Sequence, residues 1–555
     1  MKIGIGTTLP KKEYAGNLRG LKTKSTKDNK IVFSYNSDQT TIAKDKNKLI
    51  KELYDDGCDY IFIFDDDCFP IKEGWEQFFI DASIHTGCQH FIVGNDEHLN
   101  MIGEDNGLTY FQKGTGCMLF LTRKVVDEVG YMNNKYGKYG YEHAAYSYRI
   151  HRAGLTPSWY TSVDGWEEYI YSWDLQKQYA DKHKFVKVQQ FTDEEKNKYI
   201  TENEYHYRKE RRSIKNYYDY EQLVTEKKLK IGYIALQESM GGSSYYRIQG
   251  VLPLIKHDLL ELTDLSDKNW TTWQVLNGLD MLVFHRPFTA DHFAVIEQAR
   301  AMGIWVIADY DDDVLNVPDH HPVYELYNEN KANAINCVKS ADEVWASTRS
   351  ILETFYNFNH NIHVIPNAHN DYLFPVELKK PFNWEVSKLV YRGGNTHRLD
   401  LYHVKKDLQA MATENKEWQF IFIGIIDNQE FFDDMRTNTN VYLTSKMPFM
   451  QYMTHLMTIN APAMIAPLDN HKLNRAKSNI SWLEGTYAGS AFFGNKLLPE
   501  FNFPFILPFS LAGKAIKDKH IATLKKSNEE SWAYIKENLL LSKINLLRLD
   551  RLLAK

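Results

Sequence analysis

The stretch YIFIFDDDCFP, residues 60–70, constrains the fold of this chain most narrowly. Its first five residues are aromatic or β-branched, which is typical of a strand buried on both faces of a sheet. Asp65, Asp66 and Asp67 follow directly, and Pro70 prevents the strand from continuing. Ligands of open α/β sheets bind beyond the carboxyl ends of the strands, so a divalent cation could bridge these carboxylates to a diphosphate. The alternative is a solvated acidic turn that caps the following helix.

The residues around this stretch alternate between strand and helix patterns. Strands are predicted at residues 2–6, 31–36 and 90–95 and within a glycine-rich segment, 114–132, and a helix at 40–57. This alternation predicts a mostly parallel sheet with helices on both faces. A second helix is predicted to begin at Glu142, with Glu142 and His143 in its first turn, where their side chains can point into a cleft.

At 555 residues the chain is too long for one hydrophobic core, so several domains are expected. Residues 1–175 form the first predicted domain, and residues 176–228, rich in charge and poor in Gly and Pro, are predicted to be a connecting helix. Residues 229–380 and 381–555 each contain a series of short apolar runs, which predicts two Rossmann-like lobes. The predicted strands are 280–287, 304–313, 342–348 and 362–368 in the first lobe, then 388–401, 418–424, 461–468 and 490–495 in the second.

Composition limits the classes of partner and the compartment. The net charge is −6 and neither half is basic overall, so the charge does not indicate nucleic-acid binding, although a local patch stays open. The five cysteines form no CxxC pair, which indicates neither a zinc site nor a disulfide framework. We also find no signal-peptide pattern and no apolar run of the ~20 residues needed to span a bilayer. A cytoplasmic protein is therefore expected.

The ordered motifs of the first domain resemble the GT-A glycosyltransferases, in particular the inverting group that includes the bacterial chondroitin polymerase and the β-galactosyltransferases. IAKDKNKLIKELYDDGCDYIFIFDDDCFP looks like the family's helix and DxD strand, and GYEHAAYSYR like its acceptor-binding helix, with Arg149 at the family's spacing from Glu142. The resemblance implies a UDP-sugar donor and a Mn²⁺ or Mg²⁺ ion. The residues it implies are Glu142 and His143 for catalysis, Thr7, Asp38, Asn47 and Asp65 for donor binding, and Asp65, Asp67 and Asp164 as metal ligands.

The first domain departs from the family pattern at two places. His143 stands where the family has its aspartate base; imidazole is a competent base near neutral pH, but His143 could instead bond nearby backbone. The family's metal-binding histidine after this helix is also missing. Asp164 or Glu168 could replace it, because Mg²⁺ and Mn²⁺ accept carboxylate oxygen. Weak metal binding is the other alternative.

The second half resembles the GT-B glycosyltransferases of the large, mostly retaining group that includes many bacterial surface-polysaccharide enzymes. The matching motif residues are Gly241, Gly242 and Arg247, then Ile365, Pro366 and Asn367, then Gly393, Gly394, Thr396, His397 and Asp400, and finally Asn474, Lys477, Ser478 and Glu484. The resemblance implies donor binding by Arg392, Gly393, Gly394, His397, Asn474, Lys477, Ser478 and Glu484. Lys477 would neutralise the donor diphosphate, and Glu484 would accept hydrogen bonds from the ribose.

The second half also departs from its family. Ala476 stands where the more typical version has a second glutamate, which weakens the assignment of mechanism more than that of donor binding. Asp311, Asp312 and Asp313 look like a second DxD motif, but they fall in the predicted acceptor lobe. We interpret them as an acceptor-facing or capping cluster, with a metal site as the alternative.

Together the resemblances predict an α/β protein in which a GT-A domain precedes a GT-B pair of lobes. The expected function is a bifunctional transfer of sugars from nucleotide-sugar donors to a hydroxyl of a glycan or other glycoconjugate. Three alternatives stay open. One half could be a degenerate sugar-binding module, the acceptor could be hydroxymethylated bases of DNA, or the chain could be a non-enzymatic scaffold.

Overall fold

The computed structural model describes most of the chain, and the described residues are 1–9, 30–35, 41–180, 191–213, 215–217, 223–236, 242–394, 397–424, 431, 433, 435 and 437–553. The chain divides into two compact units. The first unit comprises Met1–Leu229 with Met302–Ile304, and the second Lys230–Ala301 with Trp305–Lys555. Each unit has its own sheets and its own hydrophobic core.

The first unit is built on a five-stranded sheet. Its strand order is β2 (Lys30–Tyr35), β1 (Ile3–Leu9), β3 (Tyr60–Phe64), β8 (Met118–Thr122) and β5 (His90–Ile92). β1 runs parallel to β2 and β3, whereas β8 is antiparallel to both of its neighbours. The prediction of a mostly parallel sheet did not include this reversal. It arises because the turn before β8 lies at the carboxyl end of β3, where the amide of Asp65 donates to the carbonyl of Cys117 at 2.9 Å.

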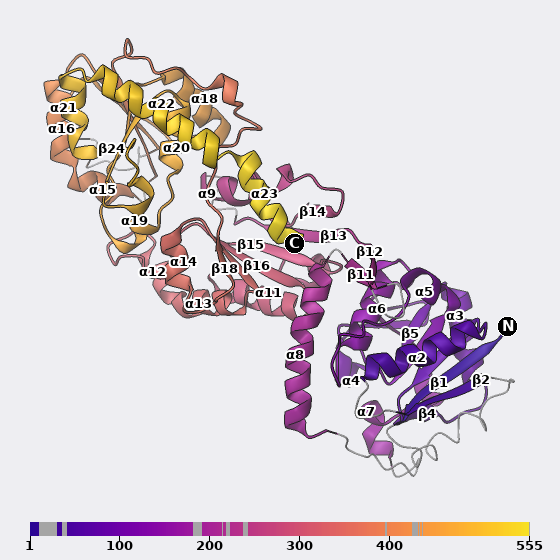
Figure 1. Ribbon diagram of the computed structural model, residues 1–555. Helices are drawn as coiled ribbons and strands as arrows, with labels where there is room; N and C mark the ends of the chain where they lie inside the picture. The colour runs from indigo at the N-terminus through magenta and orange to yellow at the C-terminus, as the bar shows by residue number, and fades with distance from the viewer. Residues whose placement is uncertain are drawn as a thin grey trace. The chain divides into compact units, whose positions relative to one another are not determined.

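The buried strand predicted at residues 60–64 is confirmed as β3, and its residues from Ile61 to Phe64 are fully buried. Phe62 lies at the centre of the core and contacts the rings of Trp75, Phe79 and Phe120. The helices of this unit's sheet layers are α2 (Ile42–Asp55), α3 (Trp75–Thr86), α5 (Arg123–Val129) and α6 (Glu142–Arg152). α2 lies against β1 and β2 (Figure 1), so its N-terminal part approaches the carboxyl end of the sheet.

Two small sheets extend the first unit beyond its main sheet. β4 (Cys68–Pro70) pairs with β10 (Ile170–Ser172), which precedes α7 (Trp173–Gln176). β6 (Met101–Asp105), β7 (Leu108–Phe111) and β9 (Tyr160–Val163) form a three-stranded antiparallel sheet, with α4 (Asp96–Leu99) just before it. These pairings decide which later residues lie near the aspartate triplet.

The segment predicted to be a connecting helix contains α8 (Asp193–Arg212). Thr192 and Glu195 form a capping box that satisfies two otherwise free amides at the start of this helix. The helix does not extend through the whole predicted range, because β11 (Lys215–Tyr217) and β12 (Leu223–Glu226) form a short antiparallel pair before the second unit begins.

The second unit contains two six-stranded sheets, one in each lobe. The N-lobe order is β14 (Leu260–Asp264), β13 (Leu229–Ile234), β15 (Met281–His285), β16 (Trp305–Tyr310), β17 (Glu343–Ala346) and β18 (Ile362–Val364). The pairs from β13 to β18 are parallel. The helices and turns used below are α9 (Gly242–Ser244), a π-helix (Tyr245–Gln249), α11 (Ala290–Ala301), α12 (Tyr324–Glu329), α13 (Lys331–Ser340) and α14 (Arg349–Phe355).

The C-lobe sheet is parallel throughout and confirms the predicted second Rossmann-like series. Its order is β21 (Val441–Thr444), β20 (Gln419–Ile423), β19 (Lys388–Arg392), β22 (Ala463–Ala466), β23 (Ala491–Gly494) and β24 (Leu507–Pro508). Its helices include α15 (Arg398–His403), α16 (Lys405–Glu414), α18 (Phe449–Ile459), α19 (Lys472–Ala476), α20 (Ile480–Tyr487) and α21 (Ala512–Lys517). Apolar clusters cover both faces of this sheet, as expected for continuous apolar strands.

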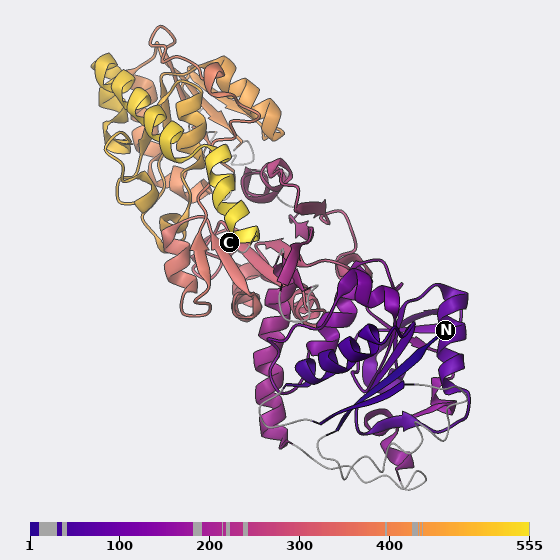
Figure 2. The same cartoon turned by 45° about the vertical axis from the view of Figure 1, so that its right-hand side comes forward.

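The last two helices connect the lobes of the second unit. α22 (Ile521–Asn538) packs on the C-lobe, and α23 (Leu541–Leu552) continues to the N-lobe, as both views show (Figures 1 and 2). There Asn545 donates to the carbonyl of Val251 at 3.3 Å, and Arg551 donates to Glu343 at 2.8 Å. Among the helices that the structure describes, none combines the length and the apolar character needed to cross a membrane.

Candidate functional site

The first candidate site lies where β3 ends at Asp65. The ammonium group of Lys46, from α2, lies 3.0 Å from Oδ1 of Asp65 and donates to the carbonyl of Gly116 at 2.8 Å. The Lys46 side chain is only 1% exposed. Its burial acts to lower its pKa, but the charges of Asp65 and Glu142 outweigh burial and raise the pKa. Lys46 is therefore a buried permanent cation between two carboxylates.

Strand parity decides which threonine of β1 contributes to this site. Thr8 donates to Oδ1 of Asp65 at 3.2 Å. Thr7, the residue expected to bind the donor, points the other way and is fully buried. Its hydroxyl has no hydrogen-bond partner among the residues that the structure describes. Asp38, also expected to bind the donor, lies outside the described residues.

Asn47, a further expected donor-binding residue, is used within the protein. Its side-chain amide donates to the carbonyl of Met132 and to the side-chain oxygen of Asn134, both at 2.8 Å, and accepts from the amide of Met132. An asparagine side chain has two N–H donors, and both are therefore occupied. In this structure Asn47 fixes the loop that precedes α6.

The expected third metal ligand does not join the aspartate triplet. Asp164 accepts a hydrogen bond from Thr109 at the end of the β7–β9 pair, and Glu168, the other candidate, pairs with Lys72 at 2.8 Å. Within the described ranges, no three His, Cys, Asp or Glu side chains come together in a way that could hold a metal ion. The reason is the pairing of β4 with β10, which brings Trp173 rather than residues 164–168 to the backbone of Asp67.

The remaining two carboxylates are a partial but chemically suitable set for a cation. Asp65 and Asp67 are both partly or largely buried at the strand end. Mg²⁺ is usually bound in proteins through one or two carboxylates together with substrate phosphates and water. The residues present therefore fit a cation that arrives with a diphosphate better than one held by a complete protein cage.

Glu142 and His143, the expected catalytic pair, do lie at this site. Nδ1 of His143 lies 3.2 Å from Oε1 of Glu142, and its Nε2 lies 3.3 Å from the carbonyl of Gly114. Both ring nitrogens thus face oxygen acceptors, an arrangement satisfied when both carry protons. A doubly protonated imidazole cannot accept a proton, so this geometry favours His143 as the residue that holds Glu142.

Glu142 is buried, and its second oxygen has no partner among the described residues. Burial would raise its pKa, but the hydrogen bond from His143 and the charges of His143 and Lys46 lower it to about 2. Tyr141, just before it, adopts a left-handed conformation with φ of 70°. Such backbone costs ~1 kcal/mol or more for a non-glycine residue and recurs at functional sites.

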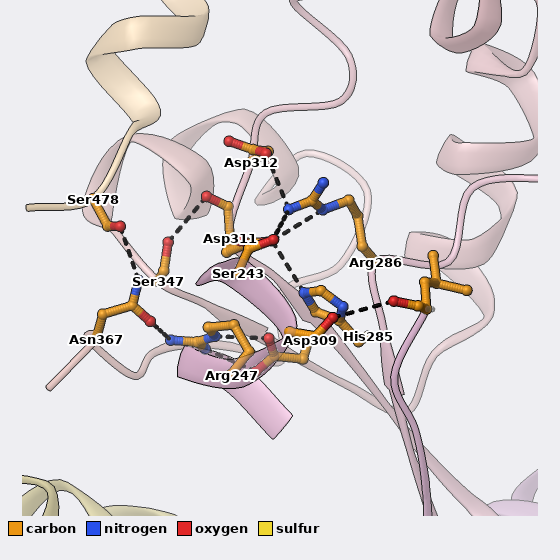
Figure 3. A network of polar contacts seen from close by, with 12 residues as sticks. Ser243, Arg247, His285, Arg286, Asp309, Asp311, Asp312, Ser347, Asn367 and Ser478 are labelled. Carbon is orange, nitrogen blue, oxygen red and sulfur yellow. Dashed lines mark hydrogen bonds and ion pairs between the residues drawn. The ribbon is translucent and has the colours of Figure 1, made fainter. Parts of the chain in front are cut away.

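The second candidate site begins with a buried network in the N-lobe (Figure 3). Arg247 donates to both carboxylate oxygens of Asp309, at 2.8 and 2.7 Å, and both side chains are fully buried. Arg247 also donates to the side-chain oxygen of Asn367 at 3.1 Å. The amide of Asn367 in turn donates to the hydroxyl of Ser478 at 2.8 Å. The expected motif residues of the two lobes therefore meet directly.

The second aspartate cluster is a set of ion pairs. Arg286 contacts Asp311 at 3.0 Å and Asp312 at 3.0 Å, as Figure 3 shows. Asp312 also accepts from the ammonium group of Lys477 at 2.6 Å. Burial would raise the pKa of Asp312, but the charges of Lys477 and Arg286 outweigh it and lower the pKa. Arg286 has φ of 48°, a second strained non-glycine position beside a candidate site.

Asp313 differs from its two neighbours. Its carboxylate accepts from Asn316 at 2.8 Å, from Thr354 at 3.0 Å and from the amide of Leu315 at 3.2 Å, which is a capping arrangement. Within the described ranges, no metal-binding group of three includes this triplet.

Glu484, expected to bind the ribose, lies at the centre of a third set of contacts. Arg392, at the end of β19, donates to it at 2.7 Å. Tyr246 and Tyr452 donate their hydroxyls to its two oxygens at 2.9 and 2.8 Å. Glu484 is 2% exposed and Arg392 is 25% exposed, so the guanidinium is the part of this pair that a ligand can reach.

The other expected donor-binding residues line the carboxyl ends of β19 and β22. Asp400 accepts from His397 at 3.0 Å and from Asn474 at 2.8 Å, which ties these three motif residues together. Gly393 and Gly394 follow β19. A Cβ on Gly424 would lie 2.5 Å from the carbonyl of Gly393, so the two turns require glycine. Gly241 and Thr396 lie outside the described residues.

Neither family models nor curated proteins match this chain. Solved structures similar to it include S. aureus TarM in complex with fondaparinux, α-GlcNAc-glycerol and UDP, with 12% identity and a TM-score of 0.38 over 50% of this chain. The match spans only 55% of TarM. An α-glucosyltransferase in complex with UDP-glucose and DNA containing an abasic site has 12% identity and a TM-score of 0.42, over 59% of this chain and 99% of that one.

The lipopolysaccharide outer core galactosyltransferase WaaB is a third such structure, with 13% identity and a TM-score of 0.36 over 57% of this chain and 98% of that one. At these identities and TM-scores, the similarity transfers no activity, substrate or partner to this chain.

Sequence reasoning missed several residues that contact the expected ones. Lys46 precedes Asn47 in a lysine-rich helix, and nothing in the sequence distinguishes this buried lysine from its exposed neighbours. Tyr246 stands next to the motif arginine, Arg247, so its position was a usable signal. Tyr452 lies on α18, outside every motif, and only the packing of that helix brings it to Glu484.

Proposed function

We propose that the chain is a bifunctional glycosyltransferase with one nucleotide-sugar site in each unit, of the GT-A type in the first and of the GT-B type in the second. The observation that carries the proposal is the convergence, within the second unit, of motif residues far apart in sequence. Lys477 meets Asp312, Ser478 meets Asn367, and Glu484 meets both Arg392 and Tyr246. These contacts gather the expected donor-binding residues at the carboxyl ends of the C-lobe strands, where ligands of parallel sheets bind.

In the second unit, cations supply the charge that a departing diphosphate needs. Arg392 and Lys477 are partly exposed and currently pair with Glu484 and Asp312. An arriving diphosphate would compete with Asp312 for the ammonium group of Lys477, since charge-assisted bonds to phosphate are strong. Glu484 would keep its two tyrosine partners and accept from the ribose hydroxyls. Fixed cations in a partly buried site would stabilise the leaving group as charge develops on it.

In the first unit, the arrangement supports transfer to a hydroxyl activated by Glu142. The second carboxylate oxygen of Glu142 has no partner among the described residues, whereas both nitrogens of His143 are engaged. Glu142 would accept the hydrogen bond of the acceptor hydroxyl and receive its proton as the hydroxyl attacks the anomeric carbon in line. His143 would orient Glu142, and Lys46 would hold Asp65 at the strand end.

Asp65 and Asp67 are the residues that would hold a divalent cation in the first unit. When bound, Mn²⁺ or Mg²⁺ would supply positive charge that offsets the charge of the leaving nucleoside diphosphate. The antiparallel β8 also supports the proposal, because it brings the Gly114–Cys117 turn beside both Asp65 and His143.

The test uses the full chain and two single variants. Binding of UDP is measured by calorimetry, with and without Mn²⁺, and turnover of a panel of UDP-sugars is measured as release of UDP. Asp67→Ala should remove only the first activity, and Lys477→Ala only the second. Absence of UDP binding would overturn the proposal, and loss of both activities in either variant would overturn the independence of the two sites. Activity lost in only one of the two variants, with the other behaving as wild type, would mean that one half is a non-catalytic module.

A further inference from the structure

A cavity in the second unit adjoins the ion pair between Lys477 and Asp312. Its volume is about 410 Å³. Residues 314–318, directly after the second aspartate triplet, form one wall, α12 and the start of α13 form another, and His471 and Lys472 close it from the C-lobe. Most of the lining therefore belongs to the N-lobe, whereas the expected nucleotide-binding residues belong to the C-lobe.

The cavity has chemistry suited to a polar ligand. Tyr324, Tyr327 and Asn328 present ring faces, hydroxyls and an amide to it. Aromatic faces and hydrogen-bonding groups together are what a polyhydroxylated ring requires. Tyr327 also connects the cavity to the ion-pair network, because Arg286 and Asp312 both act on its hydroxyl.

The charge of the lining is one-sided. Lys331 and Lys472 both line the cavity and are exposed, and neither has an ion-pair or hydrogen-bond partner within the described ranges. No aspartate or glutamate is among the lining residues. Nδ1 of His471 accepts from the amide of Asn474 at 3.3 Å, so this histidine adds a hydrogen-bonding edge rather than a competing anion. Two unpaired ammonium groups in one cavity attract an anion.

We propose that this cavity is the acceptor pocket of the second site and that it takes a polyhydroxylated acceptor carrying a phosphate or carboxylate group. The proposal rests on the proposed function of the second unit. The anionic group would pair with Lys331 and Lys472, and the sugar or polyol portion would lie against Tyr324 and Tyr327. A hydroxyl of the acceptor would then face the side of the cavity where Lys477 and Asp312 meet.

The experiment measures binding of matched probes to the full chain in the presence of saturating UDP. The probes are glucose, glucose 6-phosphate, glucuronate and inorganic phosphate, followed by saturation-transfer NMR and calorimetry. Glucose 6-phosphate and glucuronate should bind more tightly than glucose, by about two- to fivefold for each lysine engaged, since exposed charge pairs contribute modestly. The preference should weaken as salt is added. Glucose 6-phosphate should also bind more tightly than inorganic phosphate.

The variants Lys331→Ala and Lys472→Ala should each reduce the preference for the anionic sugars and leave the affinity for UDP unchanged. Lys339→Ala, which removes an exposed lysine from the far end of the same helix α13, is the control and should have no effect. Equal binding of glucose and glucose 6-phosphate, or an equal loss in the control, would overturn the proposal. Inorganic phosphate binding as tightly as the sugar phosphate would refute the sugar subsite. Anion binding without UDP binding would refute the proposed function itself and reduce the cavity to an anion site.

Discussion

Glu142→Gln should destabilise the first unit in a pH-dependent way. The pKa of Glu142 is lowered from an ordinary 4.5 to about 2, because burial is outweighed by the hydrogen bond from His143 and the charges of His143 and Lys46. A difference of this size corresponds to about 3 kcal/mol of stability in the ionised state. The folded-state pKa is the lower one, so this stability is present above pH 4.5 and is lost as the pH falls through about 2.

The measurement is differential scanning calorimetry of the full chain between pH 6 and pH 2. At pH 6, Glu142→Gln should lower the transition of the first unit by roughly 6–12 °C, as expected for about 3 kcal/mol in a unit of this size. Near pH 2 the difference should vanish, because the wild-type carboxyl is then also neutral. Glu97→Gln, which removes an exposed carboxylate in the same unit, is the control. An equal destabilisation at pH 6 and pH 2 would show that the loss is steric and that the ion pair contributes little.

Three further predictions concern single contacts. Arg247→Met should destabilise the second unit by about 3–5 kcal/mol, because it leaves the buried carboxylate of Asp309 unpaired, and a second change of Asp309→Leu should recover much of this loss in denaturant unfolding. Gly116→Ala should lower turnover at the first site with little change in UDP affinity, because the new Cβ would lie 2.8 Å from the ring of His143; unchanged turnover would contradict a role for that ring. Tyr452→Phe should weaken UDP binding only at the second site, by roughly fivefold, because one hydrogen bond to Glu484 is worth ~1 kcal/mol, and calorimetry would show this.

Several elements of this fold follow from the sequence because they depend on local patterns. The apolar run at residues 60–64 forms β3, since no other structure buries such a run so fully in an α/β domain. The helix expected at Glu142 begins there as α6. The parallel sheets of the second unit follow from apolar strands separated by helical patterns. The DxD, glycine-turn and Asn-Lys-Ser-Glu motifs likewise identified most of the residues that line the two candidate sites.

Other features depend on contacts between distant segments, and only the tertiary structure decided them. The pairing of β4 with β10 keeps Asp164 away from the aspartate triplet, and strand parity turns Thr8 rather than Thr7 toward Asp65. The partner of Lys477 is Asp312, 165 positions earlier in the chain. Sequence patterns report which face of an element is buried, because burial repeats with the period of the helix or strand. They do not report which charged group will lie opposite, because that depends on how separately folded layers pack.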